Sequence, residues 1–268
     1  ITDQIFEFNL SEVFSKSDSS KICQQLVDLC FSIIHFSGLT DDDVWDNFKT
    51  YCLKWNHHLD FVQIWGQYIV ALFSNLNLIA YQQKKSLKFN GGIYSSENPI
   101  PDNIIKFLFF NTLSLIDVKI IIEDVMLMNN FSQTMSELTM RSENIVSSLD
   151  ICFLLKRKYP AYTFLKLFGP LLTFLPSLNE SYDESISTLI SSILKIVSNF
   201  EIDHQGDLVK RLISYCVKNA STNHVKTITS FLKRGSFLFC HNSEIFPYIS
   251  QKALKFIQQL FSLGSKGI

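Results

Sequence analysis

The chain has 268 residues, of which 47% are hydrophobic and 18% are charged, and its formal net charge is −1. This hydrophobic content excludes intrinsic disorder, and the length is sufficient to bury a substantial core in one or two domains. The 24 basic and 25 acidic residues give no broad positive field of the kind that holds proteins on nucleic acid or anionic membranes, so we expect neither partner.

Six cysteines lie within apolar helical patterns, at Cys23, Cys30, Cys52, Cys152, Cys216 and Cys240. A chain of this length needs no disulfides to fold, so we predict reduced thiols and an intracellular protein, cytoplasmic or nuclear. The first residue is Ile1 rather than Met, and the chain does not open with a signal-peptide pattern. This start predicts a fragment of a longer protein or a processed product.

The first predicted helix covers residues 21–37. Ser20 stands at its N-cap position, and Gly38 supplies the left-handed residue that ends many helices. Apolar residues recur along this segment at helical spacing and predict a single apolar face, made of Ile22, Leu26, Leu29, Ile33 and Phe36.

A second helix follows, with Thr40 as its predicted N-cap and three aspartates, Asp41, Asp42 and Asp43, in its first turn, where carboxylates favour the helix dipole. Its predicted apolar face consists of Val44, Trp45, Phe48, Tyr51, Cys52 and Trp55. A third helix begins near Asp60. Residues 61–81 carry no charge over a length that could span a bilayer, but their several amide side chains predict a buried helix instead.

Residues 82–103 are polar and lack periodicity, which predicts a flexible loop. Helical patterns resume over residues 104–113, 115–128 and 145–158, with a weaker polar helix over 132–140. Gly169 and Pro170 interrupt a further apolar run over 162–175.

The clearest helical pattern covers residues 182–200, where Ser181 and Glu184 have the spacing of a capping box. Its predicted buried face consists of Ile186, Leu189, Ile190, Ile193, Leu194 and Val197. The last three predicted helices cover residues 207–218, 223–234 and 243–263, and Gly235 and Gly264 end the second and third of these.

The absence of strand patterns and the spacing of adjacent helix pairs, about 40 residues, predict an all-α fold of HEAT or armadillo type. We expect one α-helical repeat domain over residues 1–268, an α-solenoid of about ten to twelve helices. An irregular compact helical bundle is the alternative.

The sequence Asp42-Asp43-Val44-Trp45-Asp46 resembles the D-D-x-x-D motif of isoprenoid synthases, which are all-α enzymes. In that family the carboxylates hold magnesium ions that neutralise a diphosphate leaving group. The motif lies here in the first turn of a helix, where capping explains the aspartates, so we predict no metal site. A magnesium-dependent isoprenoid-synthase-type enzyme using Asp42, Asp43 and Asp46 is the alternative function.

The other candidate metal ligands, histidines and basic groups do not predict a functional site. Four potential zinc ligands, Cys216, His224, Cys240 and His241, lack the Cys-x-x-Cys spacing of structural zinc sites. His57 and His58 fit a polar turn, and the short basic groups Lys84, Lys85, Lys88 and Lys156-Arg157-Lys158 fit solvated turns. The 24 phenylalanines are more than a thin two-layer core can bury, which predicts exposed aromatics at a partner groove.

Two stretches resemble the large HEAT-repeat proteasome activator, the two-hundred-kilodalton family that caps the core particle. The first contains Val44-Trp45, Trp65, Ala71-Leu72-Phe73 and Ile100-Pro101 with Ile105 and Phe107; the second contains Tyr159-Pro160, the segment Leu171 to Leu175 and Leu178-Asn179-Glu180. The resemblance implies an internal HEAT-repeat fragment. Members of that family dock through a hydrophobic-tyrosine tail, whereas this chain ends Ser265-Lys266-Gly267-Ile268. The resemblance therefore implies no docking residues in this chain.

These observations predict a non-enzymatic scaffold that binds other proteins, as part of a large complex. The sequence contains no phosphate loop, dinucleotide fingerprint or nucleophile elbow. We therefore predict no catalytic residue, no cofactor and no small-molecule substrate.

Overall fold

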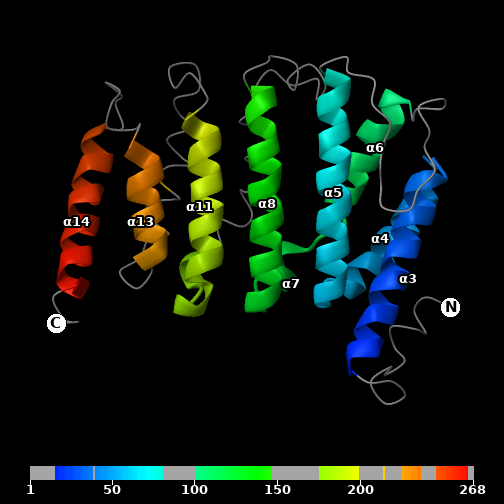
Figure 1. Cartoon of the computed structure of the whole chain (residues 1–268), viewed down its shortest axis with the longest axis horizontal. Coiled ribbons are helices and arrows are strands. Elements are labelled where there is room, and N and C mark those ends of the chain that lie inside the picture. The colour runs from blue at the N-terminus through cyan, green and yellow to red at the C-terminus, as the bar shows by residue number, and fades with distance from the viewer. Residues whose placement is uncertain are drawn as a thin grey trace. The chain divides into compact units, whose positions relative to one another are not determined.

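The computed structural model describes residues 16–38, 40–80, 101–146, 175–198, 214, 225–236 and 246–264. These residues form α-helices joined by turns and short 3-10 helices, with no strand among them (Figure 1). The all-α prediction is therefore confirmed. The chain divides into two compact units, Ile1–Thr134 and Met135–Ile268, which are described separately.

The first unit opens with helix α3 (Lys16–Phe36). Gly38 follows it with a φ of 62°, a left-handed conformation, so the predicted terminator is confirmed. The predicted start is wrong, because α3 begins before Ser20 and that residue lies inside the helix. Since an N-cap residue lies outside the regular helix, Ser20 cannot be the cap of α3.

Helix α4 (Asp42–Trp55) is capped by Asp41, and the prediction of Thr40 as its N-cap is wrong. The Asp41 carboxylate accepts hydrogen bonds from the backbone N–H groups of Asp43, at 3.0 Å, and Val44, at 3.2 Å. A charged acceptor is stronger here than a hydroxyl, because it also faces the positive end of the helix dipole. The predicted apolar face is confirmed for Trp45, Phe48, Cys52 and Trp55, which are buried, but it is wrong for Tyr51, which is exposed.

Helix α5 (Leu59–Ala80) is the central helix of the first unit. Its buried residues lie on most sides of the helix: Phe61, Val62, Ile64, Trp65, Tyr68, Ile69, Val70, Leu72 and Phe73. This confirms a buried helix in place of a membrane span. Among the described residues, every helix is too short or too polar to cross a bilayer.

The next helices are α6 (Asp102–Leu113), the one-turn α7 (Val118–Ile121) and α8 (Val125–Val146). The helix predicted over residues 115–128 is wrong, because two aspartates start new helices within it. Asp117 accepts from the N–H of Lys119 at 2.9 Å, and Asp124 accepts from those of Met126 and Leu127 at 2.6 and 3.1 Å. The weak polar helix predicted over 132–140 is a part of α8.

Helices α5 and α8 approach each other closely at Gly66. A Cβ atom built on Gly66 would lie 2.5 Å from Thr134 Oγ1, which is closer than a Cβ atom comes to a non-bonded heavy atom in proteins. Next to this point the Trp65 and Phe131 rings stack with their centroids 5.6 Å apart. The missing side chain at Gly66 therefore allows an aromatic stack between the two helices.

The second unit contains two 3-10 helices, Leu175–Ser177 and Glu180–Tyr182, followed by α11 (Asp183–Ser198), α13 (Val225–Arg234) and α14 (Phe246–Gly264). The predicted buried face of α11 is confirmed for Ile186, Leu189, Ile190, Ile193 and Leu194. On α13 and α14, Phe231 and Phe256 are buried edge to face, with centroids 5.8 Å apart. These residues are part of the described core of the unit, which also includes Met135, Leu138, Leu175, Tyr182 and Ile228.

The predicted capping box at Ser181 is wrong. Asn179 caps the 3-10 turn that leads into α11, because its side chain accepts from the Ser181 N–H at 3.0 Å. The helix thus continues directly from that turn, and Glu184 is oriented toward Lys226 instead of Ser181.

Several predicted segments lie outside the described residues. They are residues 82–100 of the predicted loop, residues 147–158 and 162–174, and nearly all of the helix predicted over 207–218.

Candidate protein-binding surface

The three candidate metal ligands lie at the start of α4. Asp42, Asp43 and Asp46 are exposed, and the Asp43 backbone is held by the Asp41 cap. Within the described residues, no group of three His, Cys, Asp or Glu side chains could hold a metal ion. The enzyme alternative required these carboxylates at the mouth of a deep cavity, whereas the structure places them on the exposed N-terminal part of α4.

His57 and His58 form part of the turn between α4 and α5, as predicted, with their ring centroids 4.1 Å apart. Half-burial lowers the pKa of His58, and the neighbouring His57 lowers it further. The other candidates, Cys216, His224, Cys240, His241, Lys84, Lys85, Lys88, Lys156, Arg157 and Lys158, lie outside the described residues.

Three of the six cysteines are described, and Cys23, Cys30 and Cys52 are free thiols, as predicted. Burial raises the pKa of each. They therefore stay protonated at neutral pH, where a thiol is a poor nucleophile and a poor metal ligand.

A buried hydrogen-bond chain around His35 joins α3, α5 and α6. His35 is fully buried, and its Nδ1 donates to the Phe31 carbonyl at 2.7 Å. The Thr112 hydroxyl donates to His35 Nε2 at 2.8 Å, and Trp65 Nε1 donates to the Thr112 carbonyl at 2.8 Å. Burial lowers the pKa of His35 to about 4, so the ring is neutral at pH 7. The arrangement is structural, since every one of these partners belongs to the core.

A second set of polar contacts aligns α3 with α5. Gln24 donates to the Asp60 carboxylate at 2.7 Å, and the Ser32 hydroxyl lies 2.7 Å from the Tyr68 hydroxyl. The two residues of each pair are 36 positions apart in the sequence. The constant separation means that α3 and α5 run in the same direction. Helices α5 and α6 run in opposite directions. The earlier α5 residue, Trp65, donates to the later α6 residue, Thr112, whereas the later Phe73 packs on the earlier Phe109.

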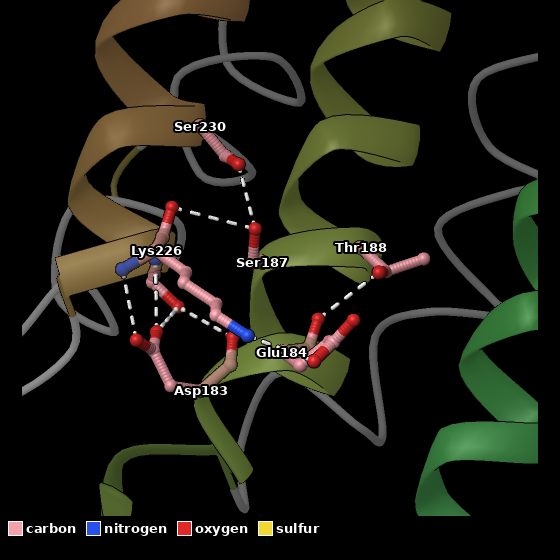
Figure 2. A network of polar contacts seen from close by, with 7 residues as sticks. Asp183, Glu184, Ser187, Thr188, Lys226 and Ser230 are labelled. Carbon is pink, nitrogen blue, oxygen red and sulfur yellow. Dashed lines mark hydrogen bonds and ion pairs between the residues drawn. The ribbon is translucent and has the colours of Figure 1, made fainter.

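In the second unit, Asp183 at the start of α11 holds the first turn of α13 (Figure 2). Its carboxylate accepts from the backbone N–H groups of Lys226, at 2.8 Å, and Thr227, at 2.9 Å, and from the Thr227 hydroxyl at 2.7 Å. One residue further on, Glu184 forms an ion pair with Lys226 at 2.8 Å. Asp183 of α11 thus serves as the N-cap of α13, and this contact joins the N-terminal ends of the two helices.

The same pairing continues one turn later. Ser187 Oγ and Ser230 Oγ lie 2.6 Å apart, and Ser187 also donates to the Lys226 carbonyl at 3.3 Å (Figure 2). Ser187 and Ser230 are 43 residues apart, the same separation as Asp183 and Lys226. Helices α11 and α13 therefore also run in the same direction.

Helix α3 has two apolar faces. Val27, Phe31 and Ile34 are buried toward α4 and α5, whereas Leu29 and Ile33 are 54% and 57% exposed. The single apolar face predicted for this helix included both of the exposed residues, so that part of the prediction is wrong. The helices that pack on α3 bury only one of its two apolar stripes. The other stripe, Leu29 and Ile33, remains accessible to a partner.

Comparison with known proteins gives one family match. The model of the RALGAPB N-terminal domain matches residues 1–83. The described part of this segment consists of α3, α4 and α5, and it includes both faces of α3. No curated protein and no solved structure matches the chain.

Proposed function

We propose that the chain is a non-enzymatic, protein-binding part of a larger helical protein with a role like that of RALGAPB. The observation that carries the proposal is the exposed stripe on α3, Leu29 and Ile33, because it lies within the segment that matches the RALGAPB N-terminal domain. A helix whose opposite face is already buried presents such a stripe to a partner without first unfolding.

RALGAPB is a regulatory subunit of a GTPase-activating complex. We infer the corresponding role here, which is to hold protein partners together in a complex and leave the chemistry to another component. The exposed aspartates of α4 favour this role over the isoprenoid-synthase alternative, since they face solvent instead of an apolar cavity.

For the architecture we propose a HEAT-like solenoid. In solenoids of this kind each repeat is a pair of antiparallel helices, and equivalent helices of successive repeats lie parallel. Two pairs of helices support it: α3 runs parallel to α5 at a separation of 36 residues, and α11 runs parallel to α13 at 43. Both separations are close to the repeat length of about 40 residues found in these families.

Small-angle X-ray scattering of the whole chain tests this architecture. A compact bundle of this length has a radius of gyration of about 18 Å. We expect a clearly larger value for a solenoid, and a value near 18 Å would contradict it. The likeness to the large proteasome activator stays a prediction, as an alternative member of the same solenoid class.

Affinity capture from cell extract tests the binding role. The bait is the 268-residue chain, and the variant Leu29→Gln/Ile33→Gln removes the apolar stripe of α3 while leaving its buried face intact. Met126→Gln is the matched control, because Met126 is an equally exposed apolar residue, at 56%, on another helix of the same unit.

We expect a specific set of proteins to bind the wild type and the control about tenfold more strongly than the α3 variant. Equal capture by all three baits would contradict a binding surface on α3. A bait that captures no protein at all would contradict the scaffold function itself.

A further inference from the structure

The turn between α3 and α4 presents a threonine whose hydroxyl takes no part in the fold. Thr40 is exposed, and it lies between Gly38, which is left-handed with a φ of 62°, and Asp41, whose backbone is extended. Asp41 caps α4 in place of Thr40, so the Thr40 hydroxyl accepts no hydrogen bond from the first turn of the helix. Within the described residues this hydroxyl has no hydrogen-bond partner at all. An enzyme that modifies Thr40 can therefore reach its oxygen without first breaking a contact.

The residues that follow Thr40 are acidic. Asp41, Asp42 and Asp43 occupy the next three positions, and all three are exposed. The Asp41 carboxylate is engaged as the cap, whereas those of Asp42 and Asp43 have no hydrogen-bond or ion-pair partner among the described residues. Protein kinases select their substrates partly by charge, and a kinase with Lys and Arg along its substrate groove would bind such free carboxylates. The turn thus combines a free hydroxyl with the charge pattern of an acidic-directed kinase substrate.

Ser181 in the second unit has a similar acidic pattern but a different structure. Asp183 and Glu184 lie two and three positions after it, and Ser181 is itself exposed. Both carboxylates are engaged, because Asp183 accepts from the N–H of Lys226 at 2.8 Å and Glu184 forms an ion pair with the Lys226 ammonium at 2.8 Å. A kinase that binds these carboxylates must break the contact between α11 and α13, whereas at Thr40 it breaks nothing. The structure therefore distinguishes two sites that the acidic pattern alone does not.

We propose that Thr40 is phosphorylated by a serine/threonine kinase of acidic-directed specificity. In this reaction Thr40 Oγ1 attacks the γ-phosphorus of ATP, a new O–P bond replaces the bond to ADP, and the hydroxyl proton passes to the catalytic aspartate of the kinase. A kinase that requires Lys or Arg in the sequence flanking its target finds neither, because none lies between Lys21 and Lys49. The inference goes beyond the proposed function, since it does not depend on which partner the chain binds.

Phosphorylation at this position would change the surface charge and leave the fold in place. A phosphothreonine carries about −1.5 to −2 charges at pH 7. At Thr40 it would stand just before the N-terminus of α4, where the positive end of the helix dipole tolerates an anion. The modification would therefore add negative charge to the turn that follows α3 without removing any contact of the Thr40 side chain.

Phosphorylation of the whole chain in vitro with γ-labelled ATP tests the proposal. A recombinant acidic-directed serine/threonine kinase is the enzyme, a basic-directed kinase is its control, and mass spectrometry of peptides identifies the labelled residue. Thr40→Val removes the hydroxyl and keeps the shape of the side chain, whereas Thr40→Ser keeps the hydroxyl. Asp42→Asn/Asp43→Asn removes the two free carboxylates and leaves the Asp41 cap in place. All these side chains are exposed, so the variants should keep the thermal midpoint of the wild type.

We expect the acidic-directed kinase to place most of the label at residue 40 in the wild type and in Thr40→Ser, and Thr40→Val to lose that label. Asp42→Asn/Asp43→Asn should slow labelling of Thr40 about tenfold, and Ser181 should be labelled about tenfold more slowly than Thr40 in the same sample. Equal total labelling of the wild type and Thr40→Val would overturn the proposal. So would equal labelling of Thr40 by the basic-directed kinase, faster labelling of Ser181, or labelling of Thr40 only after the chain has been denatured.

Discussion

The two units join their helices by different physical means. In the first unit the polar contacts between α3, α5 and α6 run through buried groups, above all His35, Thr112 and Trp65. In the second unit Asp183, Glu184 and Lys226 connect α11 to α13 at their first turns, through contacts that are exposed or only partly buried. A buried polar group that loses its partner costs more than an exposed one, so the first unit should be far more sensitive to substitution.

Trp65→Ala should give the largest loss of stability. The substitution removes a fully buried indole, its stack on Phe131 and its hydrogen bond to Thr112, and we expect a decrease of about 3–5 kcal/mol in the free energy of unfolding. The three tryptophans all lie in the first unit, so urea denaturation followed by the fluorescence of Trp45 and Trp55 reports on that unit. A midpoint close to that of the wild type would mean that the stack contributes little.

The first unit should also lose stability in acid through His35. The folded pKa of about 4 lies below the usual value of 6.5, so the unfolded chain binds more protons between these values. The contribution of neutral His35 to the free energy of unfolding is then fully present above pH 6.5. It is lost as the pH drops toward 4, by up to about 3 kcal/mol. Urea midpoints at several pH values measure this effect. His35→Gln should flatten the dependence over that window, and an unchanged slope would assign it to other groups.

In the second unit, Asp183→Ala should cost about 1 kcal/mol, because it removes the carboxylate that caps α13. Amide hydrogen exchange at Lys226 and Thr227 measures the effect locally, and faster exchange is expected at both. Ser181→Ala is the control, since the Ser181 side chain is exposed and does not cap the helix. If Ser181→Ala has the larger effect, α11 starts where its sequence predicted.

Lys226→Met should have the smallest effect. Its ion pair with Glu184 is exposed at both ends, so solvent and salt screen it. We expect no measurable change in the thermal midpoint of the chain, nor in exchange at Thr227. A clear loss of stability would show that the ion pair, in addition to the Asp183 cap, holds the two helices together.

Local sequence signals predicted one helix end and most of the buried faces, although the N-caps predicted at Ser20, Thr40 and Ser181 were wrong. Gly38 takes the left-handed conformation that its position after an apolar helix predicts. Four of the six residues of the predicted apolar face of α4 are buried, as their spacing predicts, and the same is true of the central residues of α11. These features depend on backbone sterics and helical periodicity, both of which are encoded within a few residues.

Other features depend on contacts between distant segments, and the sequence alone did not reveal them. Asp183 looks like an ordinary first-turn carboxylate of α11, and its role as the cap of α13 follows only from the parallel packing of the two helices. His35 lies in an apolar helix without any motif, so its bond to Thr112, 77 residues away, has no local signature. On α3 both apolar stripes have helical spacing, and only the position of α5 determines which one is buried.

The close approach at Gly66 has a consequence for how related sequences can vary. Since a Cβ at position 66 would overlap Thr134 Oγ1, a larger residue at 66 requires a smaller one at 134. We therefore expect the two positions to covary in homologues, with Ala at 66 accompanied by Gly or Ala at 134. Such a covarying pair would identify the α5–α8 contact in a distant relative whose overall sequence no longer resembles this chain.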